Sequence, residues 1–229
     1  MSFQDRPSPR PSPAGGRGRL SYAVKECFLT LQGEGVQSGS RAVFVRFAGC
    51  NLWSGREQDR ATAQCNFCDT DFVGTDGDGG GKFRGAQELA AHVAALWGEG
   101  AEQRLVVITG GEPMLQLDPE LIDALHARGF RVAVETNGTL PAAEGIDWVC
   151  VSPKAGTDVV QRSGNELKLV WPQAGIDPAE LEGWGFDHFL VQPMDCEARD
   201  DALQAAIKLA MDRPKWRLTL QAHKVVGLP

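Results

Sequence analysis

The sequence predicts an α/β fold, an incomplete (β/α) barrel of about six parallel strands. Six short apolar, β-branched runs recur along the chain, and helix-period segments lie between several of them. Near-continuous apolar strands that alternate with helices are typical of a parallel sheet covered on both faces. Six strands are too few for a closed eight-stranded barrel. The runs are residues 42–47, 105–109, 131–136, 148–152, 167–171 and 189–192.

The chain is expected to form one domain preceded by a tail. Its 229 residues are an ordinary length for a single domain. Residues 1–19 are rich in Pro, Ser, Gly and Arg and show no apolar period, which indicates a flexible N-terminal tail. Residues 20–229 then hold the domain, including a long loop at 49–85 that interrupts the alternation of strands and helices.

About four helices are expected. One has clear boundaries, because Asp118 suits its N-cap, Pro119 its first turn and Gly129 its end. A shorter one starts at Asp177-Pro178. Two more are predicted by apolar residues at i, i+4, i+7 and i+8, which share one helix face. These residues are Leu89, Val93, Leu96 and Trp97 in the first, and Leu203, Ile207, Ala210 and Met211 in the second.

Composition excludes several classes of protein. The net charge of −7 argues against a broad basic surface for nucleic acid. No apolar run approaches the ~20 residues of a membrane span. The N-terminal residues have no apolar core of a secretory signal, so we expect a cytoplasmic location. In that compartment, six cysteines are better explained as ligands or buried thiols than as disulfides.

Three of these cysteines are clustered in the long loop. Fourteen residues separate Cys50 from Cys65, and two separate Cys65 from Cys68. Three thiolates on a four-iron cluster leave one iron open for a substrate or cofactor, whereas a closed structural zinc site needs four ligands. A zinc site completed by a distant ligand such as Cys27, and free thiols without any metal, are the alternatives.

The loop resembles that of the radical S-adenosylmethionine (SAM) enzymes. Phe67 precedes the third cysteine, and the segment 109–113 (TGGEP), directly after a strand, resembles the family's GGEP motif. Most of the superfamily has a three-residue first spacer, so the fourteen-residue spacer is a departure that lengthens the loop at modest entropic cost. The resemblance implies a 4Fe–4S cluster on Cys50, Cys65 and Cys68, with SAM bound to it.

The resemblance is closest to the 7-carboxy-7-deazaguanine synthases, and it covers the chain from about residue 24 to its end. It rests on residues 31–35, 44–52, 68–70, 135–139 and 152–154. These enzymes convert 6-carboxy-5,6,7,8-tetrahydropterin to 7-carboxy-7-deazaguanine with loss of ammonia, on the route to queuosine and other 7-deazapurines. The resemblance therefore implies a radical ring contraction, in which no catalytic side chain is assigned beyond the cluster and SAM.

The resemblance also implies a set of binding residues. Those for SAM are Phe67, Gly110, Gly111, Glu112, Ser152, Pro153, Lys154, Gln192, Pro193, Met194 and Asp195. Those for the pterin are Leu31, Gln32, Gly33, Glu34, Arg46, Thr109, Glu135, His223 and Pro229. Arg46 is expected to pair with the substrate carboxylate. Thr70 is expected to bind Mg²⁺ together with substrate oxygens.

Partners are implied in the same way. The resemblance implies a flavodoxin or ferredoxin as electron donor and a homodimer. Two alternative functions stay open: a glycyl-radical activating enzyme acting on a protein, and a non-catalytic metal-binding interaction module. The first would not need a pterin site. The second would have no use for the 109–113 segment or for polar residues at successive strand ends.

Overall fold

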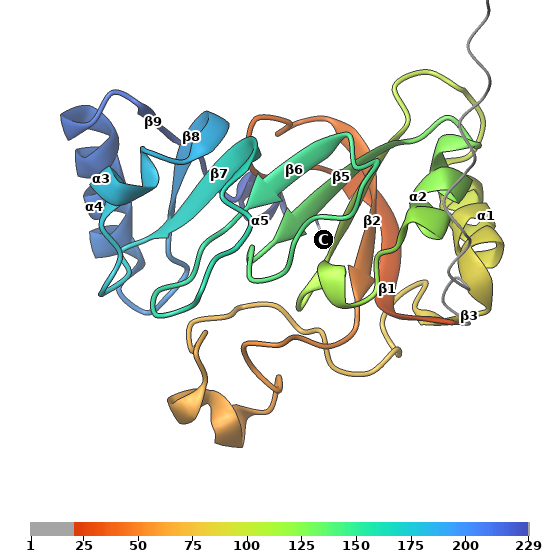
Figure 1. Ribbon diagram of the computed structural model, residues 1–229, viewed down its shortest axis with the longest axis horizontal. Coiled ribbons are helices and arrows are strands. Elements are labelled where there is room, and N and C mark those ends of the chain that lie inside the picture. Colours follow the sequence, from red (N-terminus) through yellow and green to blue (C-terminus); the bar gives the residue numbers. More distant parts are fainter. Residues whose placement is uncertain (1–20, 229) are drawn as a thin grey trace, which may run out of the picture.

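The computed structural model describes residues 21–228, so the expected tail at 1–19 and Pro229 lie outside the described residues. Within them, nine strands form one sheet in the order β3-β1-β2-β4-β5-β6-β7-β8-β9 (Figure 1). The strands are β1 (Tyr22–Leu31), β2 (Arg41–Phe47), β3 (Gly81–Phe83), β4 (Leu105–Gly110), β5 (Arg131–Thr136), β6 (Trp148–Val151), β7 (Ser163–Trp171), β8 (Gly185–Pro193) and β9 (Trp216–Leu218).

The incomplete barrel predicted from the sequence is confirmed. From β2 through β9 each neighbouring pair is parallel, and β3 and β9 are the two open edges of the sheet. The six predicted strands correspond to β2, β4, β5, β6, β7 and β8.

Three strands were missed by the sequence pattern. β1 is antiparallel to both β2 and β3, and it mixes buried with half-exposed residues instead of forming a continuous apolar run. β3 and β9 have only three residues each, too few to show a period.

Helices cover the sheet in two groups at its two ends (Figure 1). α1 (Gly85–Trp97) and α2 (Pro119–His126) pack with β1, β2 and β5, while α4 (Arg199–Asp212) packs with β7, β8 and β9. Two short helices, α3 (Pro178–Leu181) and α5 (Ala222–Val226), and two 3₁₀ turns, η1 (Glu57–Thr62) and η2 (Pro113–Leu115), complete the described elements. None of the helices in residues 21–228 is long and apolar enough to cross a membrane.

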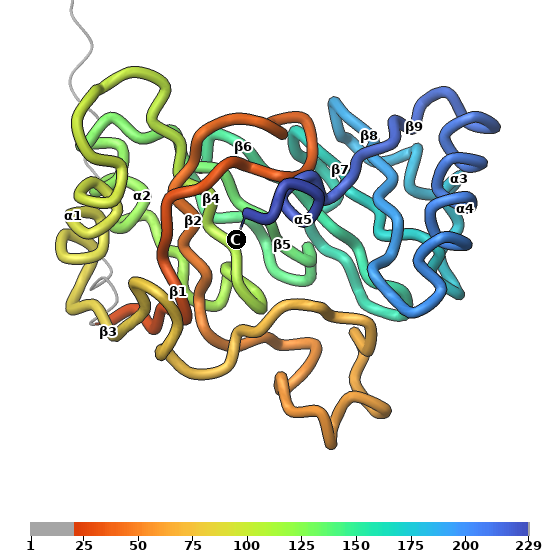
Figure 2. Tube along the Cα trace, turned by 180° about the vertical axis from the view of Figure 1, so that it is seen from behind, coloured from red at the N-terminus to blue at the C-terminus, as the bar shows by residue number. Residues whose placement is uncertain are grey.

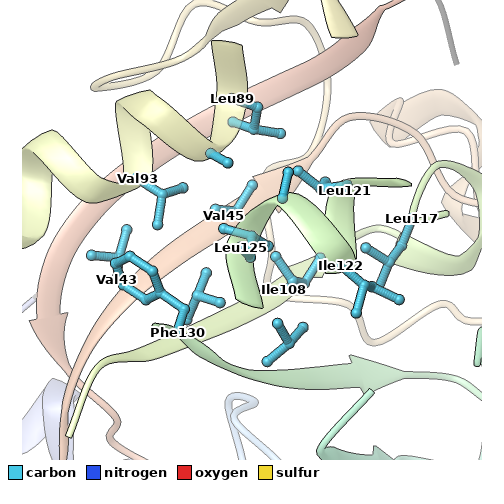
Figure 3. Close-up of a cluster of buried hydrophobic side chains, with 14 of the residues drawn as sticks. Val43, Val45, Leu89, Val93, Ile108, Leu117, Leu121, Ile122, Leu125 and Phe130 are labelled. Atoms are coloured by element: carbon cyan, nitrogen blue, oxygen red, sulfur yellow. The ribbon is translucent and has the colours of Figure 1, made fainter. Parts of the chain in front are cut away.

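The larger hydrophobic core lies between α1, α2 and the first strands of the sheet. Val43 and Ile108 point from β2 and β4 toward Leu89 of α1 and Leu125 of α2, and all four are fully buried (Figure 3). A second core under α3 and α4 contains Leu167 and other apolar residues of β7 and β8.

The predicted helix boundaries and faces are mostly confirmed. The Asp118 carboxylate caps α2 by accepting a hydrogen bond from the Leu121 backbone N–H at 3.0 Å. The helix ends at His126, three residues before Gly129, which lies in the following turn. Asp177 caps α3 in the same way. On α1, the predicted face is buried.

The predicted face of α4 is wrong by one position. Its buried residues are Ala202, Ala206 and Leu209, whereas Met211 is 77% exposed. Small alanine side chains let this helix approach the sheet closely, so that the larger apolar residues lie beside the contact instead of within it. The helix face was predicted from the spacing of mostly large apolar residues, and such a pattern gives little weight to alanine.

The long loop between β2 and β3 projects from the sheet below the strands in Figure 1. As predicted, it contains no α-helix before α1 begins; its only regular elements among the described residues are η1 and β3. Lys25 of β1 holds the end of the loop to the sheet, because its ammonium lies 2.8 Å from both the Asp71 and the Asp76 carboxylates. The loop is therefore tied to the domain at the side that carries its cysteines.

Candidate active site

A cavity of about 430 Å³ opens at the carboxyl ends of the parallel strands. Its lining includes Arg46 of β2, Gly110 of β4, Thr136 of β5, Val170 of β7 and Pro193 of β8, each within two residues of its strand's end. The carboxyl ends of parallel strands are where β/α folds bind their ligands. The volume lies in the usual range for small-molecule and cofactor sites.

Most of the predicted site residues meet in this cavity. Of the predicted residues, only Glu112 and Pro153 do not line it, and Pro229 lies outside the described residues. Those that do line it are Leu31, Gln32, Gly33, Glu34, Arg46, Cys50, Cys65, Phe67, Cys68, Thr70, Thr109, Gly110, Gly111, Glu135, Ser152, Lys154, Gln192, Pro193, Met194, Asp195 and His223.

The three loop thiols lie on one side of the cavity. A hydrogen bond with Cys65 lowers the pKa of Cys68 to about 6, and the same bond raises the pKa of Cys65. Burial raises the pKa of the Cys50 thiol. Lys154 lies near Cys65 and Cys68, and its ammonium donates 2.7 Å hydrogen bonds to the carbonyl and hydroxyl oxygens of Ser152.

The donor set fits an iron–sulfur cluster better than a zinc ion. Among residues 21–228, no three His, Cys, Asp or Glu side chains are arranged around a single ion. A four-iron cluster held by three thiolates leaves its fourth iron open, so it needs no fourth protein ligand. The zinc alternative also fails at its fourth ligand, because Cys27 is 1% exposed in the hydrophobic core and does not line the cavity.

The segment after β4 packs directly on the first cysteine. A Cβ atom added at Gly111 would lie 2.6 Å from Cys50 Cβ and would overlap the Gly49 carbonyl oxygen. The Glu112 backbone N–H donates to that same oxygen at 3.0 Å. Glycine at position 111 thus allows the two loops to touch, which places the backbone of both beside the cluster ligands.

Glu112, which the motif predicts to contact SAM, does not line the cavity. It is fully buried, and its carboxylate accepts hydrogen bonds from the Thr136 hydroxyl at 2.7 Å and from the backbone N–H groups of Asn137 and Met114, both at 2.9 Å. Burial raises the pKa of this carboxyl above its ordinary value, although the three hydrogen bonds act in the opposite direction. The carboxylate therefore joins the segments that follow β4 and β5.

Charged and amide side chains also line the cavity. Glu34 and Glu135 both bond to the ammonium of Lys168, and Gln32 Nε2 donates to Glu135 Oε1 at 2.8 Å. Arg46 lies on the neighbouring strand, where its Nε–H donates to Glu26 Oε1 at 2.6 Å. These groups present acceptors and donors suited to a flat, polar heterocycle that carries a carboxylate.

The C-terminal helix α5 completes the cavity. Figure 2 shows it beside the connection between β1 and β2, where the Ala222 backbone N–H donates to the Gly33 carbonyl oxygen at 2.8 Å. A side chain at Gly33 would overlap the His223 ring. Lys224 joins the long loop that carries the three cysteines (the cluster loop) to the segment after β8. Its ammonium contacts Asp69 at 2.7 Å and Asp195 at 2.6 Å.

Sequence reasoning missed several lining residues, of which Lys168 is the most informative. A lysine inside the otherwise apolar run 167–171, between two fully buried leucines, is a signal that could have found it. The others had no local signal, since their roles depend on segments distant in the sequence. They include Glu26, Asp69, Gln221 and Lys224.

Comparison with known proteins gives three kinds of similarity. The model of the Radical SAM superfamily matches residues 58–168. The 7-carboxy-7-deazaguanine synthases of Caulobacter vibrioides and Bordetella pertussis are 61% and 60% identical to this chain, over 92% of it and the full length of each relative. The crystal structure of QueE from Escherichia coli is similar with a TM-score of 0.68 and 29% identity, over 89% of this chain and 95% of that one.

Proposed function

The chain belongs to the 7-carboxy-7-deazaguanine synthase family of radical SAM enzymes, and we propose on that premise how its cavity carries out the family's reaction. The reaction is the ring contraction of 6-carboxy-5,6,7,8-tetrahydropterin to 7-carboxy-7-deazaguanine with loss of ammonia, in queuosine biosynthesis. Membership in this family excludes the glycyl-radical activating enzyme and the non-catalytic metal-binding module.

One observation supports this function above all. Three thiols and a cluster of carboxylate, amide and guanidinium groups line the same cavity of about 430 Å³. A site for the cluster alone would not need the second group, and a site for the pterin alone would not need the first. Together they allow a substrate to lie next to a cluster-bound cofactor.

Cys50, Cys65 and Cys68 would hold the 4Fe–4S cluster, and the backbone of residues 110–112 with Ser152, Lys154 and 192–195 would hold SAM. When bound, the cluster and SAM supply the radical that starts the ring contraction. The protein's own contribution is placement and exclusion of water. The buried Lys154 ammonium lies beside the thiols, where its positive charge offsets part of the negative charge of three thiolates.

The substrate's two ends are recognised by different groups. Arg46 uses its Nε–H for Glu26, and its two terminal nitrogens would pair with the substrate carboxylate. Glu34 and Glu135 accept hydrogen bonds from the N–H groups of the pyrimidine ring, and His223 of α5 covers it. Thr70, two residues beyond Cys68, lines the cavity and would supply an oxygen ligand to Mg²⁺ bound together with the substrate.

The remaining expectations belong to the same proposal. A flavodoxin or ferredoxin would reduce the cluster, the enzyme would act as a homodimer in the cytoplasm, and residues 20–229 would form its single domain after an N-terminal tail. Family resemblance supports the electron donor and the homodimer. The absence of a spanning helix among residues 21–228 is compatible with the location.

Anaerobic reconstitution followed by two assays tests the proposed function. The reconstituted enzyme with a chemical reductant and SAM should form 7-carboxy-7-deazaguanine only when 6-carboxy-5,6,7,8-tetrahydropterin and Mg²⁺ are added. The matched control is the Cys65→Ala variant, treated identically. SAM cleavage without any deazapurine product, under conditions where cluster content is full, would show that the assigned substrate is wrong.

A further inference from the structure

Lys168 is a buried cation that the proposed reaction does not yet use. It lies on β7 between Leu167 and Leu169, which face the second hydrophobic core, and its own side chain points to the opposite face, toward the cavity. Only 4% of that side chain is exposed. Lysine is almost never buried to this degree unless it is paired, so its partners decide its role.

Its partners are two carboxylates from separate elements. The Lys168 ammonium contacts Glu135 Oε2 at 2.7 Å and also bonds to Glu34 Oε2. Glu135 lies near the end of β5, and Glu34 follows β1. Both glutamates line the cavity, and both are proposed above to accept hydrogen bonds from the substrate.

The other oxygen of each carboxylate is also held. Gln32 Nε2 donates to Glu135 Oε1 at 2.8 Å, and Gln221 Nε2 donates to Glu34 Oε1 at 2.9 Å. All four oxygens are thus oriented by fixed donors, and each keeps a lone pair for one further donor. The arrangement points two ionised carboxylates into the cavity with little freedom to rotate.

The charges around Lys168 favour this arrangement. Burial opposes its positive charge, but Glu135 and Glu34 raise the pKa of Lys168 well above its ordinary value. Conversely, burial opposes ionisation of Glu34, and Lys168 lowers the pKa of that carboxyl. The other groups facing this cluster are Cys150, Glu166, Lys154 and His223.

We propose that Lys168 is a positioning residue that holds Glu34 and Glu135 ionised and aligned as acceptors for the substrate's ring N–H groups. This inference rests on the proposed function. Glu34 and Glu135 both pair with the Lys168 ammonium. Without that cation they would be like-charged neighbours in a buried site, and one of them would take up a proton. Protonation converts one of the two carboxyl oxygens into an O–H donor, so the pair loses one of the acceptors that would face the substrate's ring N–H groups.

The sign of the resulting pH dependence follows from this account. In a variant without the cation, the pKa of the pair rises, so the acceptor is lost at lower pH and restored as the pH increases. Buried carboxyls next to a like charge reach pKa values of about 8–9. The KM for the pterin should therefore fall with rising pH in the variant and stay level in the wild type between about pH 6.5 and 8.5.

The test compares wild-type enzyme with Lys168→Met after reconstitution with cluster and SAM. Lys168→Met should raise the KM for the pterin by about tenfold or more at pH 7. The KM for SAM and the iron content should match the wild type, because neither carboxylate lies among the proposed SAM contacts. The control is Arg213→Met, which removes a more exposed ion pair with Glu182 away from the cavity and should change none of these values.

Two outcomes decide the question. A pterin KM in Lys168→Met that equals the wild-type value, or that is raised equally at every pH, would overturn the inference. If the wild type itself fails to convert the pterin, it is the proposed function that fails instead.

A second variant keeps the inference testable if Lys168→Met does not fold. Lys168→Met combined with Glu34→Gln restores the charge balance of the buried cluster, so we expect it to fold. Because Glu135 then has no like-charged partner in the pair, the pterin KM should be raised but independent of pH. A wild-type KM in this double variant would equally overturn the inference.

Discussion

Gly111→Ala tests whether the contact between the segment after β4 and the cluster loop is as tight as the structure shows. The backbone of Gly111 does not adopt a left-handed conformation, so alanine is allowed there and the effect is purely steric. The added methyl would lie 2.6 Å from Cys50 Cβ and would overlap the Gly49 carbonyl oxygen. Both are held by the backbone of the cluster loop, which cannot rotate out of the way.

The magnitude follows from two contributions. Overpacking at a site without free space costs about 1–3 kcal/mol. Displacing the loop also breaks the 3.0 Å hydrogen bond from the Glu112 backbone N–H to Gly49, for about 1 kcal/mol. The total of about 2–4 kcal/mol should lower Tm by about 4–16 °C for a chain of this size.

The assay is anaerobic thermal unfolding of the reconstituted protein, with iron content measured on the same samples. The matched control is Gly183→Ala, a glycine that also lacks a left-handed backbone and whose added methyl would meet only the Glu180 carbonyl oxygen at 3.5 Å. That variant should be unchanged or slightly stabilised. A Gly111→Ala protein with full iron content and a Tm within about 2 °C of wild type would refute the packing described here.

Four further predictions concern single residues. Alanine at any one of the three loop cysteines should abolish iron and sulfide binding together with SAM cleavage; an intact 4Fe–4S absorption in one variant would remove that cysteine from the ligand set. Arg46→Ala should weaken pterin binding by about 2–5 kcal/mol but leave SAM binding unchanged, and Arg46→Lys should restore it only in part; equal pterin affinity in wild type and Arg46→Ala would contradict the assigned pairing. Thr70→Val should lose the stimulation by Mg²⁺ that exhaustively chelated wild type regains; full activity of the chelated wild type would show that no metal is needed. Asp118→Ala should destabilise the protein by about 1–2 kcal/mol in urea unfolding, because the carboxylate accepts from both the Leu121 N–H at 3.0 Å and the Tyr22 hydroxyl at 2.7 Å; an unchanged midpoint would argue against the cap.

The sequence predicted those features that depend on neighbouring residues. The cap at Asp118, the buried face of α1 and the six apolar strands of the parallel sheet all follow from short-range patterns, and the structure confirms them. The close spacing of Cys65 and Cys68 is local in the same sense. Cys50 could be grouped with them from the sequence as well, because all three cysteines lie in the one loop after β2.

The failures have a common physical origin. The predicted face of α4 was wrong because small alanines, which carry little weight in a hydrophobic period, decide how closely the helix packs. The strand β1 was missed because its residues mix buried and exposed positions and form no continuous apolar run. The motif predicted Glu112 as a SAM contact, but no sequence pattern showed that its carboxylate accepts hydrogen bonds from Thr136 and from two backbone N–H groups.

The sequence alone determined the six central parallel strands, most helices, the clustering of three thiols in one loop and the group of polar residues at the strand ends. Only the tertiary structure decided which charged side chains meet. Glu34, Glu135 and Lys168 come from three segments separated by 33 to 134 positions, and their contact depends on the register of β5, β6 and β7 and on the path of the chain after β1. A buried charge is stable only beside its partners. Lys168 can therefore be buried at the cavity only because the fold brings Glu34 and Glu135 next to it.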